Sequence, residues 1–327
     1  MPIAANHVQF YKATVNDDTP NNGGLISTTL IADGVKNNIF PDASKNERLN
    51  GSTKYRKAFL SLRNPDSTPA IDVKLFVLRP TQAVDSITLI KKGKTDTQSS
   101  ILSTDSRWGA GFLLSAAAVG VTTITVAPEQ SLHEVFESGD TIAITTRNES
   151  NPTALVDYYI INAIVADGVN KVITLNRGLD NAMPAGAVVS SCITKSTFSA
   201  TATQLQATAT FDFNQIVLNN AGTIDDSWGL VFTSATEFSL YQLSAGMTVP
   251  VATGNIGSAF SPINSQNNQP FFTMPTTFFN GTYAANNILE FTTSSADQGF
   301  FIERIIPAGT DYAAGNSVLL AVELESA

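Results

Sequence analysis

Residues 71–78 read Ile-Asp-Val-Lys-Leu-Phe-Val-Leu, a run in which the apolar side chains Val73, Leu75 and Val77 recur at every second position. Because successive side chains of a strand point to opposite faces, this period of two predicts a strand with one face in a core. Comparable runs, bounded by Gly, Pro, Asn and Asp, recur along the whole chain and predict strands at residues 25–32, 55–62, 122–126, 139–144, 158–166, 172–175, 208–213, 288–292, 300–306 and 318–324.

The composition also favours strands. Hydrophobic residues make up 43% of the 327-residue chain and charged residues 14%, whereas an average soluble domain has about 25% charged residues. The polar surface must therefore come from Thr, Ser, Asn and Gln, which suit pleated surfaces better than helical ones. We expect an all-β protein of two to three β-sandwich or β-barrel modules with one or two short helices.

One short helix is marked by its capping residues. Ser44 and Glu47 have the spacing of a capping box, in which each side chain accepts a hydrogen bond from the other residue's backbone N–H. Gly51 follows at a position suited to end the helix after about two turns.

Turn-rich and charge-poor stretches divide the chain into three expected domains. Residues 1–103 form a basic N-terminal β domain with the short helix, and residues 104–195 form a small β-barrel or sandwich module. Residues 196–327 form an acidic C-terminal β-sandwich domain. Strands recurring about every 15 residues are the reason for expecting a small barrel or sandwich in the middle module.

Charge is unevenly distributed between these parts. Residues 1–103 hold 13 of the 19 Lys and Arg against 9 acids, and the rest of the chain holds 6 bases against 19 acids. The split serves solubility, or it reflects complementarity between the basic part of one subunit and an acidic neighbour. On the second interpretation Lys54, Arg56 and Lys57 belong to an assembly interface whose strength falls as salt rises.

Cysteine usage and hydropathy restrict the setting. The single cysteine, Cys192, excludes an intrachain disulfide, and its flanks predict a buried thiol in a strand. No apolar stretch approaches the ~20 residues of a membrane span, and the N-terminus shows no signal-peptide pattern. These features are consistent with folding in a reducing cytoplasm, and no membrane contact is expected.

Catalytic chemistry is not indicated, and the chain is expected not to be an enzyme. His7 and His133 lie far apart without a nucleophile motif, and no metal-ligand or cofactor-binding spacing is present, so no cofactor is expected. The net charge of −9 makes nucleic-acid binding unlikely. A weak alternative is a polysaccharide-degrading enzyme that uses paired carboxylates, for which Glu134, Glu137 and Asp140 are available.

Paired aromatic residues indicate a second kind of contact. Phe271 and Phe272, and Phe278 and Phe279, are sequence neighbours, so a strand would point one ring of each pair away from the core. The other ring would be buried against a second sheet or a neighbouring subunit, and we place these four residues with the basic cluster as the candidate assembly interface. The alternative is a carbohydrate-binding module in which these rings, or Trp108 and Trp228, stack on sugars.

Three stretches, in order along most of the chain, resemble virion structural proteins of tailed bacteriophages with contractile tails. They comprise residues 31–42 with 47–57, residues 139–144, and residues 260–264, 272–275, 305–309 and 315–319. The resemblance implies a homo-oligomeric ring at the neck or collar, assembled in the host cytoplasm and incorporated into the virion. Its neighbours would be portal or connector, tail or baseplate proteins, and the alternative place in the particle is the baseplate.

Overall fold

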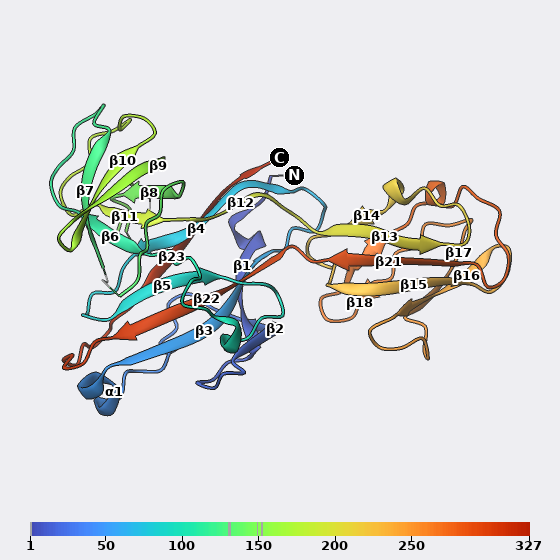
Figure 1. The fold of residues 1–327 in the computed structure, drawn as a ribbon. Coiled ribbons are helices and arrows are strands. Elements are labelled where there is room, and N and C mark those ends of the chain that lie inside the picture. Colours follow the sequence, from blue (N-terminus) through green and yellow to red (C-terminus); the bar gives the residue numbers. More distant parts are fainter. Residues whose placement is uncertain (1, 130–131, 149, 152) are drawn as a thin grey trace.

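The computed structural model describes residues 2–129, 132–148, 150–151 and 153–327. Figure 1 shows three β bodies, which we call the base, the barrel and the tip. The barrel and the tip extend from opposite ends of the base, and both chain termini lie on the base. The expected all-β class with several sandwich or barrel modules is confirmed.

The base is a sandwich of two antiparallel sheets. A five-stranded sheet in the order β2-β1-β3-β22-β5 faces a three-stranded sheet in the order β12-β4-β23. Alternate side chains of β3 (Leu60), β4 (Leu75) and β22 (Phe300) fill the space between them. The strands are β1 (Val8–Val15), β2 (Gly23–Leu30), β3 (Ser52–Leu62), β4 (Ala70–Arg79), β5 (Ser86–Lys91), β12 (Ile193–Phe198), β22 (Asp297–Ile306) and β23 (Leu319–Ser326).

The barrel is inserted between β5 and β12 of the base. Its six strands close in the order β10-β7-β6-β11-β8-β9, and a core that includes Val126, Ile144 and Ile173 fills it. Gly111 allows the close approach of β6 to β7, because a Cβ there would lie 2.5 Å from the Ala127 carbonyl oxygen. The strands are β6 (Ala110–Leu113), β7 (Thr123–Pro128), β8 (Thr141–Thr145), β9 (Val156–Asp167), β10 (Asn170–Leu175) and β11 (Val188–Ser191).

The tip is inserted between β12 and β22. Its main sheet has the order β13-β21-β15-β16-β17, and two short pairs, β14 with β20 and β18 with β19, accompany it. The strands are β13 (Thr201–Ala207), β14 (Val217–Leu218), β15 (Asp226–Phe232), β16 (Glu237–Gln242), β17 (Ala252–Asn255), β18 (Ile263–Asn264), β19 (Gln269–Pro270), β20 (Phe272–Thr273) and β21 (Ile288–Ser294).

Helical structure is short. The expected capped helix is confirmed as α1 (Lys45–Asn50): the Ser44 hydroxyl accepts the Glu47 N–H, and the Glu47 carboxylate accepts the Ser44 N–H. Gly51 follows it at a φ of 77°, a backbone conformation that glycine adopts without strain. The remaining helical turns are the 3-10 segments η1 (Ala5–His7), η2 (Gln98–Ser100), η3 (Phe213–Gln215) and η4 (Thr276–Phe278).

The domain boundaries differ from the expected ones in one main respect. The middle module, expected at 104–195, corresponds to the barrel, but the third domain, expected at 196–327, ends near residue 294. β22 lies at the centre of the five-stranded base sheet, paired with β3 on one side and β5 on the other, and β23 pairs with β4. The base is therefore built from three separate segments, because pairing partners more than two hundred residues apart leave no local mark on a sequence.

Candidate functional site

The expected basic interface is not a free surface. Lys54 forms ion pairs with Glu47 and, at 3.1 Å, with Asp18. The Arg56 guanidinium pairs with the same Asp18 at 2.6 Å and is 6% exposed. Lys54 and Arg56 are neutralised by acids of their own chain. This corrects the expectation that they pair with an acidic surface of a neighbouring subunit.

Lys57 is the most deeply placed of the three predicted cations. It is 1% exposed, and its ammonium donates to the carbonyl oxygens of Gly24 at 2.7 Å, Asp96 at 2.7 Å and Lys94 at 3.0 Å. The Phe59 ring lies 4.9 Å from the same nitrogen. Burial lowers the pKa of Lys57 to about 8. Lys57 therefore fastens the loop around residue 95 and the start of β2 to the base sheet, a structural role.

The four predicted phenylalanines lie inside the tip. Phe272 and Phe278 are fully buried and Phe271 is 7% exposed, while Phe279 packs against the same core and stacks on Phe238 at 5.1 Å. Of the environments expected for the second ring, the structure has burial within the chain itself, so the assignment of these residues to an assembly interface is corrected. Phe278 belongs to a 3-10 turn rather than a strand, and the chain's own short strand pairs form the second layer that covers the rings.

The tryptophans considered for sugar stacking are also covered. Trp228 is 0% exposed, and its indole N–H donates to the Thr293 hydroxyl at 2.8 Å. Trp108 packs against the base core and forms backbone hydrogen bonds with Leu89 in β5. Trp228 is therefore closed to a surface ligand, and Trp108 is partly buried.

The acids considered for hydrolysis do not form an isolated pair. Glu134 is bound by the Lys171 ammonium at 2.6 Å. Asp140 accepts the backbone N–H of Glu137 at 2.9 Å, as in a turn. Within the described residues, no group of three or more His, Cys, Asp or Glu is arranged to hold a metal ion.

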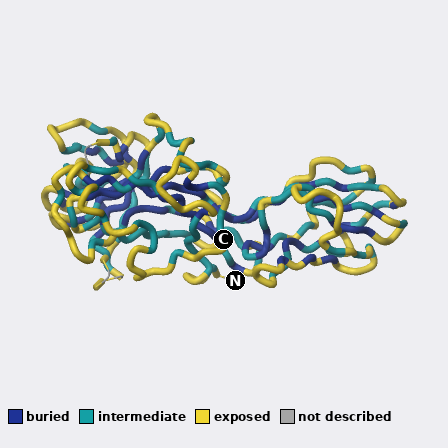
Figure 2. Tube along the Cα trace, turned by 90° about the horizontal axis from the view of Figure 1, so that it is seen from below, coloured by how far each residue is buried: buried dark blue, intermediate teal, exposed yellow. Residues whose placement is uncertain are grey.

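The contacts that organise the molecule lie where the tip joins the base. Figure 2 shows buried segments continuing through the narrow connection between these two bodies. At its centre is Asn220, which is 0% exposed. Its amide donates to Asn64 Oδ1 at 2.9 Å and to the Thr68 carbonyl at 3.0 Å, and its Oδ1 accepts the Ala200 N–H at 2.7 Å. One tip side chain thus fastens both a base turn and a connecting segment. We call this region the joint.

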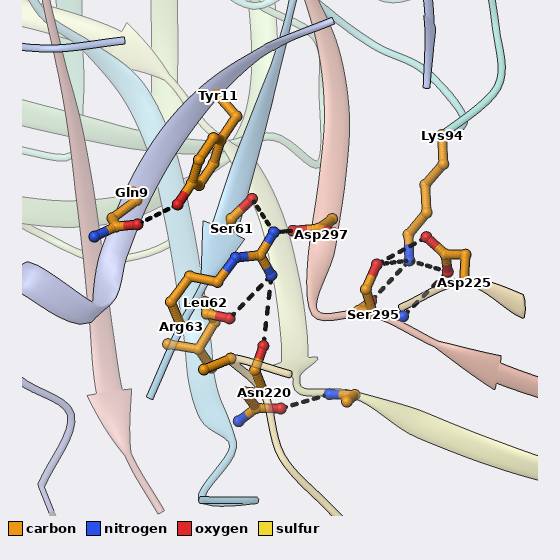
Figure 3. A network of polar contacts seen from close by, with 12 residues as sticks. Gln9, Tyr11, Ser61, Leu62, Arg63, Lys94, Asn220, Asp225, Ser295 and Asp297 are labelled. Atoms are coloured by element: carbon orange, nitrogen blue, oxygen red, sulfur yellow. Dashed lines mark hydrogen bonds and ion pairs between the residues drawn. The ribbon is translucent and has the colours of Figure 1, made fainter. Parts of the chain in front are cut away.

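A buried ion pair lies beside Asn220. Arg63, at the end of β3, is paired with Asp297, at the start of β22, at 2.7 Å, as Figure 3 shows. The Arg63 guanidinium also donates to the Ser61 hydroxyl at 3.3 Å and lies 5.3 Å from the Tyr11 ring centroid. Because Asp297 is 3% exposed, removal of Arg63 would leave a buried carboxylate without its charge partner.

A second ion pair crosses the joint directly. Lys94, in the base, contacts Asp225, in the tip, at 2.7 Å, and also donates to the Ser295 carbonyl at 2.7 Å (Figure 3). Partial burial alone would raise the pKa of Asp225, but the Lys94 ammonium and the hydroxyls of Ser294 and Ser295 lower it overall. This contribution to docking is present above the ordinary pKa of an aspartate and is lost as the pH falls through the lowered value.

A buried carboxylate of the base lies where the barrel begins. Glu303, in β22, is 0% exposed and accepts hydrogen bonds from Tyr55 at 2.8 Å, Thr88 at 2.6 Å and Arg107 at 3.1 Å. The His133 imidazole of the barrel lies 3.5 Å away. Burial raises the pKa of Tyr55 to about 12, so the phenol remains a donor to Glu303 at neutral pH.

Two contacts dock the barrel on the base. Glu129, at the end of β7, accepts the backbone N–H of Thr81, in the base, at 3.1 Å, and burial raises the pKa of Glu129 to about 7. Cys192 lies in a small apolar cluster between the two bodies, and burial raises its thiol pKa to about 12. The expected buried thiol is confirmed, although Cys192 lies between β11 and β12 and not within a strand.

The tip presents a different surface from the rest of the molecule. Residues 201–294 contain no Lys, Arg or His and only five acids, two of which, Asp225 and Asp226, lie near the joint. Its sheet ends in two edge strands, β13 and β17. In β13 five of the seven residues are exposed. Neither the joint nor the exposed edge β13 was predicted from the sequence. The uncharged run from Ser196 to Phe211 was a signal for the exposed edge.

No protein-family model matches this chain, and no curated protein matches it. Comparison with solved structures finds the VP2 subviral particle of infectious bursal disease virus, 14% identical over 88% of this chain and 84% of that chain, with a TM-score of 0.12. A structure of the Gt strain of the same virus is 14% identical over 88% and 83%, with a TM-score of 0.09. Backbones with such scores do not superpose, so this likeness carries no argument.

No α-helix in the described part of the chain has the length and apolar character that a bilayer crossing requires.

Proposed function

We propose that this chain is a structural subunit of a tailed-phage virion that assembles into a homo-oligomeric ring at the neck or collar. The observation that carries the proposal is the attachment of two flanking domains to one base by buried polar contacts. The joint holds the tip through Asn220 and the Lys94–Asp225 ion pair, and Glu129 binds the barrel to the Thr81 backbone of the base. Fixed angles between the bodies allow every copy to meet its neighbours with the same geometry, which a closed ring requires.

The proposed role is mechanical. Copies would bury surface against one another and against portal, connector or tail proteins, and permanent contacts of this kind bury on the order of 2,000 Å² or more. The candidate contact surfaces are the exposed strand edges and the outer walls of the barrel and tip, in place of the basic cluster and the phenylalanines. No chemical step and no cofactor form part of the proposal.

Electron microscopy tests the ring. The purified full chain at high concentration is expected to give closed rings of one copy number, and the same protein is expected in purified particles by mass spectrometry. Monomers at all concentrations together with absence from particles would overturn the proposal. Antibody labelling of particles distinguishes the neck from the baseplate, the alternative position.

A further inference from the structure

β13 has hydrogen-bond partners on one side. It pairs with β21 from Thr201 opposite Ser294 to Ala207 opposite Leu289, and it forms the end of the tip sheet. Its remaining backbone N–H and C=O groups point away from the sheet. Such a row of groups is complementary to one kind of occupant, another extended strand.

β13 lacks most of the features that usually keep sheet edges apart. The run from Ser196 to Phe211 contains no charged residue and no proline, the two commonest protections of an edge. The edge strand β2 of the base, in contrast, has two register shifts against β1. In β12, an edge of the three-stranded base sheet, the Thr194 carbonyl accepts a hydrogen bond from the Lys91 ammonium. β13 has one irregularity, at Leu205.

Leu205 is flanked by a glutamine on each side and then only by small uncharged residues. Residues 200–210 read Ala-Thr-Ala-Thr-Gln-Leu-Gln-Ala-Thr-Ala-Thr. An antiparallel pair of two such strands places Gln near Gln and only Thr or Ala beyond, with no like charges opposed in any nearby register. Leu205 is 57% exposed, and in this pair it would be covered by Leu205 of the second copy, which removes apolar surface from water.

We propose that β13 pairs with β13 of a second copy of this chain, antiparallel across a two-fold axis near Leu205, so that two tip sheets become continuous. The contact is isologous: each residue meets its counterpart in reverse order. It goes beyond the ring proposed above, because neighbours in a simple ring meet through two different surfaces. Tip pairing would instead join two subunits, or two rings, face to face.

A charge swap tests the two-fold geometry. Leu205→Glu and Leu205→Lys each oppose like charges across the axis, so each full-length variant is expected to raise the dimer dissociation constant by about fivefold or more. An equimolar mixture places Glu beside Lys and is expected to return to within about twofold of the unmodified chain. Sedimentation velocity measures all four samples. The same pair of changes at Leu102, which is 58% exposed in the base, is the control and should leave association unchanged.

Disulfide trapping is the second arm. Leu205→Cys is expected to give a disulfide-linked dimer under mild oxidation, because a two-fold pair brings the two Cα atoms within about 7 Å. Val217→Cys, 51% exposed elsewhere on the tip, is the matched control, and Cys192 is buried at 2% exposure. A monomeric unmodified chain, a mixture no stronger than either charge variant, or equal trapping at both positions would overturn the proposal. A mixture that associates no more strongly than either charge variant would instead indicate pairing of β13 with β17.

Discussion

The base and the tip are both antiparallel β structures, but they are stabilised by different means. The base buries charged side chains in its sheets, including Lys57, Arg56 and Glu303. The tip contains no cation, and its core is a cluster of rings around Trp228 and Phe272. Hydrogen-bonded charged side chains help to stabilise the base, and aromatic packing stabilises the tip. A substitution that removes one kind of contact should therefore affect one body more than the other.

The comparison also explains the charge split of the sequence. The base, made of residues 1–109, 192–200 and 295–327, holds 16 Lys and Arg against 15 acids. The excess of Lys and Arg in the first third of the chain is balanced by acids of the same domain, some of which lie in β22 and β23. Reversing Lys54, Arg56 and Lys57 to Glu would therefore break internal ion pairs and the fold, and would not isolate a docking effect.

The largest effect is expected in the tip core. Phe272→Ala should lower the free energy of unfolding of the tip by about 3–5 kcal/mol, since a fully buried ring leaves a cavity that the surrounding rings fill only in part. Urea unfolding followed by Trp228 fluorescence measures it. Val217→Ala, exposed on the same body, should change it by less than about 0.5 kcal/mol. A similar loss in both variants would contradict the importance of the rings.

Removing the buried lysine of the base should be the next most costly change. Lys57→Met leaves three carbonyl oxygens without their donor and should cost on the order of 3 kcal/mol, with the tip transition unaffected. Calorimetry that resolves the separate bodies is the measurement. Lys45→Met, on the exposed face of α1, is the matched control. Equal stability of Lys57→Met and the unmodified chain would mean that water replaces the ammonium.

The joint links the two bodies and should respond to loss of one amide. Asn220→Ala removes three hydrogen bonds, and we expect about 2–3 kcal/mol less docking energy with both bodies still folded. Small-angle X-ray scattering should show a wider range of tip positions, and proteolysis near residues 199 and 295 should accelerate. Asn50→Ala in α1 serves as the control. An unchanged scattering profile would show that the Lys94–Asp225 ion pair is enough to hold the joint.

The barrel contact should be sensitive to pH. The pKa of Glu129 is raised to about 7, so the folded state retains a proton that the unfolded state loses above about pH 4.5. Stability should therefore fall as the pH rises from about 4.5 to about 7, by about 2 kcal/mol given its partial exposure. Glu129→Gln should flatten this dependence, whereas Glu134→Gln should not. A profile that is identical in all three proteins would remove Glu129 as its cause.

The smallest effect is expected from salt on tip pairing. The tip has no cation to screen, so raising the ionic strength from about 0.05 to about 0.5 M should change the dimer dissociation constant by less than about twofold. Sedimentation at both ionic strengths is the measurement, with the Leu205→Glu and Leu205→Lys mixture as the salt-sensitive comparison. A steep dependence in the unmodified chain would place the contact on the charged base instead.

Much of the architecture could be predicted because it depends on local patterns. The alternation around Val73 and Leu75 indicated β4, and the spacing of Ser44, Glu47 and Gly51 indicated α1. Low charge with abundant Thr, Ser and Asn indicated an all-β protein. Each of these signals is carried by residues within about ten positions of one another, so the chain's own covalent order is enough to express it.

The tertiary structure decided the contacts between distant segments. Arg63 meets Asp297, and Glu303 meets Tyr55, through strand pairings that a single sequence does not encode locally. The same pairings bring acids of β22 to the basic segment and turn an expected docking surface into internal ion pairs. The phenylalanine pairs were assigned to an assembly interface because a strand alternates its side chains, but the tip itself covers both rings of each pair. Sequence thus determined which elements form, and long-range pairing determined which side chains remain free to meet a partner.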